Sequence, residues 1–314
     1  MRPRKRKYVD RPSQKCMLLQ KLMGSHHTSE GMRNMNFVHS SDLKTIDLDV
    51  QRSAAHWDVH RHLSAAERER IRTALRTTVF NVISSCQGLR YYQGIHEICL
   101  VVLQATNIDV EMTSSICRSI MLKHFTSLLY HDFSVSLTPL LEGLQYLVET
   151  TDPELARILE SSGVGYHFSV PWLLTWFAHS VNDFDSICLI YRHLLDQDPI
   201  DNPFSCLYLC CAVIAQQRET IIRNYHDSCR IFQTLQTSPQ CADFKFAIKS
   251  AMMMEANNPV REIVANCPKL AEARVFTQMR GKKVIHIGIA LGVSVLALLS
   301  YFVLPIDRLA TFMQ

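Results

Sequence analysis

The sequence is poor in glycine and lacks the signatures of common nucleotide-binding and hydrolytic sites. Only 10 of its 314 residues are glycine, and none forms G-x-x-x-x-G-K-S/T, G-x-G-x-x-G or G-x-S-x-G. The zinc-protease signature H-E-x-x-H is also absent. These motifs hold phosphates, nucleophiles or zinc in defined backbone settings. The chain therefore shows no nucleotide site of its own.

Alternation of apolar and polar residues is missing as well. No stretch keeps a period of two between hairpin turns, which is the main signal of a half-buried strand. Glycine is also too scarce for the many tight turns of a sheet-based fold. We therefore predict that the folded part of the chain is all-α.

The cysteines lack a C-x-x-C pair, and their total of 11 is odd. This disfavours a disulfide framework or a closed zinc site and suits a reducing cytosol, where most cysteines are small core residues. His56 and His60 have helical i, i+4 spacing, but such a pair is more typical of a solvated surface than of a metal site. We expect no bound metal.

Positive charge is concentrated at the N-terminus. Residues 1–33 contain nine Lys or Arg, five of them in MRPRKRK, against two acidic residues, so the local balance is +7 within a net charge of +4. Such a run could contact anionic lipid or nucleic acid, or direct the protein to the nucleus. Tyr8 is the only aromatic residue in this segment, fewer than a nucleic-acid reader would need, so we interpret the segment as a solvated tail and expect no nucleic-acid partner.

One long apolar run stands near the other end of the chain. Residues 284–304 contain no Asp, Glu, Lys or Arg. About 20 helical residues cross a ~30 Å hydrocarbon core with all backbone hydrogen bonds made internally. Arg280, Lys282 and Lys283 precede this run, whereas Arg308 beyond it is offset by Asp307. The positive-inside rule then places the upstream part in the cytosol, and we expect a single-pass, tail-anchored protein.

Two amphipathic helices are predicted before that run. Apolar residues with i, i+3, i+4, i+7 spacing recur over 67–86 and over 137–148. Pro139 is expected in the first turn of the second helix, and Asp152-Pro153 marks its end. Denser apolar segments, PWLLTWFAHSV, SICLIYRHLL and CLYLCCAVIA, indicate buried helices.

Two short stretches stand out from this helical pattern. IDLDVQRS contains Ile46, Asp49 and Arg52, and YYQGIHEI contains Tyr91, Gln93 and Gly94. Taken singly they are unremarkable: Arg52 could be a surface arginine, Gln93 a polar helix cap and Asp49 an N-cap.

Together, these stretches resemble the TBC-domain family of Rab GTPase activators. The family signatures are I-x-x-D-x-x-R and Y-x-Q-G, and both occur here in order. The segment from Trp172 to Leu195 is similar to the tryptophan-rich helix of the family and the helix after it. The resemblance covers roughly residues 40–230.

The resemblance implies an all-α TBC (Rab-GAP) domain followed by one transmembrane helix. Arg52 would be an arginine finger and Gln93 a glutamine finger, both supplied in trans to a Rab GTPase. Ile46 would be a core residue, Asp49 and Tyr91 would support the site, and Gly94 would permit close backbone approach. GTP and Mg²⁺ would belong to the Rab, so the chain is expected to have no cofactor of its own. The alternative is a catalytically weak TBC-fold tether.

The resemblance has one clear departure. Family members usually open with a tryptophan-proline-leucine element, yet the first tryptophan here is Trp57, which follows the arginine motif. We therefore expect the opening helices to be missing or unrecognisable. His96, close to Gln93 in sequence, is interpreted as a packing or surface residue.

The predicted organisation has five parts. They are a basic N-terminal segment (1–40), the TBC domain (41–232), a helical stalk (233–283), the transmembrane helix (284–304) and a short lumenal tail (305–314). The span and the family together suggest the endoplasmic reticulum or Golgi membrane and a Rab of traffic between them as the partner.

Overall fold

The computed structural model describes residues 13–24, 38, 40–53, 57, 62–85, 90–125, 133–198 and 204–270. Every regular element within these ranges is helical, which confirms the all-α prediction. None of these helices is both long enough and apolar enough to cross a membrane. The predicted span, the MRPRKRK run and the tail lie outside the described residues.

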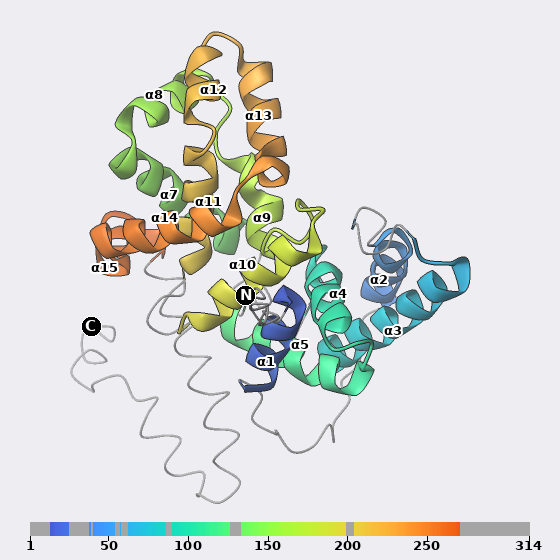
Figure 1. Cartoon of the computed structure of the whole chain (residues 1–314). Helices are drawn as coiled ribbons and strands as arrows, with labels where there is room; N and C mark the ends of the chain where they lie inside the picture. Colours follow the sequence, from blue (N-terminus) through green and yellow to red (C-terminus); the bar gives the residue numbers. More distant parts are fainter. Residues whose placement is uncertain are drawn as a thin grey trace, which may run out of the picture.

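The helices fall into two groups with four shorter or central elements between them (Figure 1). The first group comprises α2 (Ser40–Arg52), α3 (Ala65–Ser84), α4 (Ile95–Ala105) and α5 (Val110–His124). The second comprises α7 (Phe133–Thr151), α8 (Pro153–Ser161), α11 (Ser205–Ala215), α12 (Arg218–Arg223), α13 (Ser228–Cys241), α14 (Phe244–Asn257) and α15 (Val260–Asn266). Between them lie α1 (Gln14–Gly24), η2 (His167–Ser169), α9 (Val170–Thr175) and α10 (Phe184–Asp196).

Helix α4 is the centre of the first group. Ten of its eleven residues are buried, and it contacts α1, α2, α3, α5 and α9. Because neighbours surround it, its N-terminal end is a rigid base for the residues that precede it.

The predicted amphipathic helix over 67–86 is α3. A capping box of Ser64 and Glu67 begins it, and its apolar stripe is buried against α2, α4 and α5. The second predicted helix is α7, which begins earlier than expected, at Phe133. Pro139 therefore lies in the helix interior and not in the first turn, where its missing N–H leaves one helical hydrogen bond unmade. Asp152 caps α8 directly after α7 ends.

An opening helix is present, contrary to expectation. Leu18 and Leu22 of α1 are fully buried, and the helix packs on α10 and α4. Gln14 accepts a hydrogen bond from Arg192 on α10 at 2.7 Å. This helix contains no tryptophan, and its buried face is formed by the two leucines. Trp57 is buried elsewhere and donates to the Ala178 carbonyl at 3.1 Å.

The segment expected as a stalk begins within the helical body. The predicted boundary at 232 falls inside α13, and α14 packs against α11 and α10. Phe244 and Ala247 of α14 and Ile263 of α15 are buried. Through Leu270, this part of the chain therefore packs on the same core as the preceding helices.

Candidate activating site

Arg52 is the last residue of α2 and extends from the end of a helix, not from a loop. Ile46, Asp49 and Arg52 are spaced three residues apart, which gives them related directions on the helix. Ile46 and Asp49 are buried, whereas 60% of the Arg52 side chain is exposed. The helix thus fixes the base of the arginine and leaves its guanidinium at the surface.

The Asp49 carboxylate contacts one residue of each motif. Its Oδ1 accepts from Arg52 Nη2, and its Oδ2 accepts from the Tyr91 phenol at 2.7 Å. The backbone carbonyl of Asp49 also accepts from Ser53 Oγ at 2.6 Å. A fully buried carboxylate is stable only when its oxygens are paired, so these contacts explain why an aspartate is tolerated here.

A second buried carboxylate of α2 binds the loop that contains Tyr91 and Gln93. Asp42 lies two turns before Asp49, and its Oδ2 accepts from Arg90 Nε at 3.3 Å and from the Tyr91 backbone N–H at 3.4 Å. Asp42 belongs to neither signature motif. Two carboxylates on one helix therefore bind the segment that leads to Gln93.

Gln93 and Gly94 form the turn before α4. Gln93 is exposed, while Gly94 is buried and is the N-cap residue of α4. The φ of Gly94 is +133°, and a Cβ there would lie 3.2 Å from Thr175 Cγ2 and from Tyr92 Cε2. Only glycine fits this backbone and this close approach. The turn thus presents Gln93 to solvent from a fixed base.

Sequence reasoning missed a buried polar chain behind the two motifs. The phenol of Tyr91 lies 2.7 Å from His96 Nδ1, and His96 Nε2 lies 3.4 Å from Glu97 Oε1. His179 Nδ1 reaches the same Glu97 oxygen at 3.5 Å. Because the phenol has one proton and donates it to Asp49, His96 Nδ1 is the donor to Tyr91. His96 is thus buried and belongs to the site.

A signal for these residues was present in the sequence. His96 and Glu97 are the only ionisable residues, apart from cysteine, at the start of the apolar helix IHEICLVVLQA, and both are 4% exposed. Buried ionisable residues require partners, so their presence indicated a polar contact. Their partners lie far along the chain, and the sequence alone did not show them.

Two pKa shifts describe the electrostatics of this chain of contacts. Burial, helped by the hydrogen bond to Asp49, raises the pKa of Tyr91 well above its usual range, so the phenol remains a donor. The hydrogen bond to Glu97 raises the pKa of His179, although burial and the positive charge of Arg52 oppose this.

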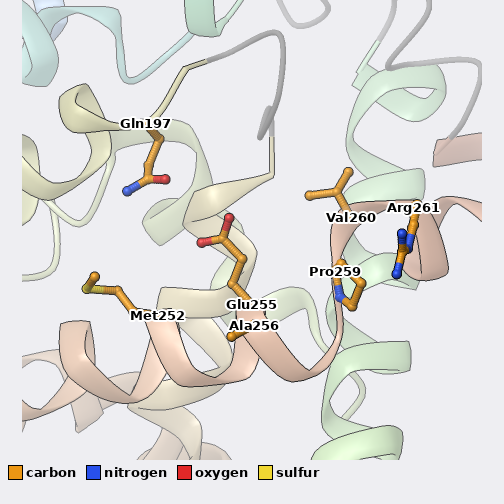
Figure 2. Close-up of a pocket in the computed structure, with 7 residues that line it drawn as sticks. All are labelled: Gln197, Met252, Glu255, Ala256, Pro259, Val260 and Arg261. Carbon is orange, nitrogen blue, oxygen red and sulfur yellow. The ribbon is translucent and has the colours of Figure 1, made fainter.

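Two open depressions on the described part of the chain lie outside these residues. One open depression of about 550 Å³ is formed by the end of α10, α14 and the start of α15, and it is lined by Gln197, Met252, Glu255, Ala256, Pro259, Val260 and Arg261 (Figure 2). Another, of about 640 Å³, lies between α3 and α5. Neither includes a residue of the two motifs, and the exposed arginine and glutamine suit a protein surface better than a small-molecule cleft.

Within the described ranges, no group of three or more His, Cys, Asp or Glu side chains is arranged to hold a metal ion. His56 and His60, the pair considered from the sequence, lie outside the described residues.

Comparison with known proteins identifies the family. The family model of the Rab-GTPase-TBC domain matches residues 14–222, from the first residue of α1 into α12. The chain belongs to the Rab-GTPase-TBC domain family. TBC domains as a family are GTPase-activating proteins that act on Rab GTPases. The match begins before the predicted domain start at 41 and includes the opening helix.

Curated relatives agree with this family. The chain is 26% identical over 195 residues to GTPase-activating protein gyp10 of Schizosaccharomyces pombe, covering 60% of this chain and 48% of the relative. It is 23% identical over 225 residues to human TBC1 domain family member 20, covering 71% and 53%. The latter is the family member that YYQGIHEI and the predicted span favour. The chain spans about half the length of these relatives.

A solved TBC domain has the same fold. The crystal structure of the Ypt/Rab-GAP domain of Gyp1p superposes with a TM-score of 0.55 at 14% identity, covering 78% of this chain and 80% of that one. At this identity the likeness supports the fold of the TBC domain and not the roles of individual residues.

Proposed function

We propose that this TBC domain accelerates GTP hydrolysis by a Rab GTPase and that it supplies Arg52 and Gln93 in trans. The observation that carries the proposal is the joint fixation of both residues by one buried carboxylate and its neighbours. Asp49 binds Arg52 directly and binds Tyr91, two residues before Gln93. One carboxylate thus links the helix that carries Arg52 to the loop that carries Gln93.

Arg52 suits the charge that develops during phosphoryl transfer. Its guanidinium is always protonated, and its planar donors match phosphate oxygens. An arginine finger accelerates hydrolysis by about 10³–10⁵-fold in GTPases as a class. Asp49 presets the orientation of Arg52, which reduces the ordering required when the Rab docks.

Gln93 suits the attacking water. An amide accepts from water through its carbonyl and donates through its NH₂, and it carries no charge that would repel the γ-phosphate. The turn at Gly94 and the buried α4 hold it in place. The chain needs no cofactor of its own in this scheme, because GTP and Mg²⁺ are bound by the Rab.

The proposal includes a membrane anchor formed by residues 284–304. Rabs act at membrane surfaces, and tethering an activator to the same surface raises its effective concentration there. The likeness to TBC1 domain family member 20 is consistent with the endoplasmic reticulum or Golgi. We propose that membrane as the location and a Rab of traffic between the two as the substrate.

Single-turnover hydrolysis by a panel of GTP-loaded Rabs tests the proposal. The full chain in detergent should accelerate hydrolysis by at least one Rab, and Arg52→Ala and Gln93→Ala should each remove nearly all of the acceleration. Arg157→Ala on α8 and Gln233→Ala on α13 are matched controls, because both residues are exposed and lie outside the site. Binding of a Rab without acceleration by the unmodified chain would instead support a tether.

A further inference from the structure

The turn that carries His179 is tightly held, which distinguishes this residue from an ordinary surface histidine. Trp176 and Phe177 have left-handed backbones, with φ of 48° and 66°, and both side chains are buried. Such conformations are unfavourable for bulky residues and persist where the surroundings fix them. The His179 backbone N–H also donates to Thr175 Oγ1 at 3.2 Å.

The same turn packs against the loop of Gln93. The Tyr92 phenol donates to the Leu174 carbonyl at 3.2 Å. Thr175 Cγ2 and the Leu174 carbonyl lie beside the Cα of Gly94, where a Cβ would approach them to 3.2 and 3.4 Å. The segments that carry Gln93 and His179 are therefore in direct contact.

Glu97 fixes the His179 ring from the interior side. This carboxylate is 4% exposed, and its Oε1 lies 3.5 Å from His179 Nδ1. A buried carboxylate favours a positively charged partner, so Glu97 promotes the imidazolium form. The ring itself is 58% exposed.

The side chains of His179 and Arg52 are both more than half exposed, and both are cations when His179 is protonated. Among the residues that the structure describes, the charged groups that act on His179 are Glu97 of α4 and Arg52 at the end of α2, and these two contact His96 and Asp49 respectively. The positive charge of Arg52 opposes the rise in the pKa of His179, as repulsion between like charges does. An anionic group of a docked partner would relieve this repulsion.

We propose that His179 is a third contact residue of the activating surface, which as an imidazolium donates to an anionic acceptor of the docked GTPase. The inference rests on the proposed function and extends it. The acceptor is either a phosphate oxygen of the bound nucleotide or a carboxylate of the GTPase. Because the Glu97 contact raises the pKa of His179, this contribution is present at low pH and is lost as pH rises through that raised pKa.

The pH dependence of activation tests this role. The full chain in detergent is assayed from pH 6 to 8.5 against the Rab that it activates best, after subtraction of the intrinsic rate of that Rab. His179→Gln should reduce kcat/KM about 10-fold at pH 6.5, the change expected for loss of one charge-assisted hydrogen bond. The decline of kcat/KM toward high pH should also be smaller in this variant. His179→Lys should keep the higher rate with a flat profile, because lysine stays charged throughout.

The outcomes separate this inference from the proposed function. Equal kcat/KM in His179→Gln overturns the inference alone. A pH profile that is unchanged in His179→Gln does so as well, because the titration then belongs to another group. Absence of activation of any Rab by the unmodified chain overturns both. His167→Gln, at another exposed histidine, should change nothing. A loss confined to kcat identifies the phosphate as the acceptor, and a raised KM identifies the carboxylate.

Discussion

The phenol of Tyr91 donates to the carboxylate of Asp49 at 2.7 Å, and this contact joins α2 to the loop before α4 across 42 residues of sequence. The other oxygen of that carboxylate receives Arg52. One aspartate therefore sets the position of the arginine and of the loop that leads to Gln93. The first two predictions concern the two ends of this contact.

Tyr91→Phe should lower both stability and activation. It removes a donor from the buried Asp49 and leaves one carboxylate oxygen without that partner, which costs about 1–3 kcal/mol in free energy of unfolding. Activation should fall by more than the loss of stability explains, because the loop that contains Gln93 loses its hydrogen bond to α2. Thermal melting and single-turnover hydrolysis measure the two effects.

The control for Tyr91 is Tyr146→Phe on α7. The Tyr146 phenol accepts from Asn266 at the surface, at 2.9 Å, and lies outside the site. This substitution also removes one hydroxyl, but it should leave activation unchanged. Equal activation by the Tyr91→Phe chain and the unmodified chain would show that the tie to Asp49 does not position Gln93.

Asp49→Asn should reduce activation at least about 10-fold while keeping the shape of the side chain. The neutral amide loses the charge-assisted contact with Arg52 and places an NH₂ group near one of its two donors. Asp47→Asn is the matched control, two residues away on the same helix. Its partner Arg76 is exposed, and exposed ion pairs contribute only about 0–1 kcal/mol. If both variants reduce activation equally, the effect comes from α2 in general and not from Asp49.

The sequence predicted the parts of this domain that depend on local spacing. The apolar stripe of α3 and the stop at Asp152 follow from periods and end signals that act over a few residues. Arg52 and Gln93 were found as family motifs. The opening helix α1 was missed because its buried leucines replace the expected tryptophan, so the fold retained an element that the signature did not show.

The rest of the site depends on contacts between distant residues. Asp42 meets Tyr91 across 49 positions, and Glu97 meets His179 across 82. No local pattern encodes such pairs. The left-handed backbones of Trp176 and Phe177 are likewise imposed by their surroundings, because nothing in those residue types favours positive φ. Sequence reasoning therefore found the exposed fingers and missed the buried residues behind them.

Gly94→Ala should abolish most activation and destabilise the domain by more than about 1 kcal/mol. The methyl group would be forced into a positive-φ backbone and would press on Thr175 and Tyr92 at 3.2 Å. Gly163→Ala separates these two effects, since Gly163 also has positive φ, +70°, but no atom lies within 4 Å of the added methyl. We expect that control to lose some stability and keep its activation. Thermal melting beside the hydrolysis assay gives both values, and full activation in Gly94→Ala would contradict a fixed Gln93 turn.

The membrane anchor can be tested without reference to the Rab. Two arginines placed in the predicted span, Val293→Arg with Leu296→Arg, should release the full chain from membranes, because each costs about 2.5–3.5 kcal/mol at the centre of a transmembrane helix. Met313→Arg adds charge beyond the run and should leave the chain bound.

Alkaline carbonate extraction of cell membranes distinguishes an integral protein from a peripheral one. Extraction of the unmodified chain at high pH would show that residues 284–304 do not span the bilayer, whereas retention of the unmodified and Met313→Arg chains with loss of the double-arginine chain would support the anchor. If the released double-arginine chain still accelerates Rab hydrolysis in solution but no longer on Rab-bearing vesicles, the anchor acts by concentrating the two proteins on one surface.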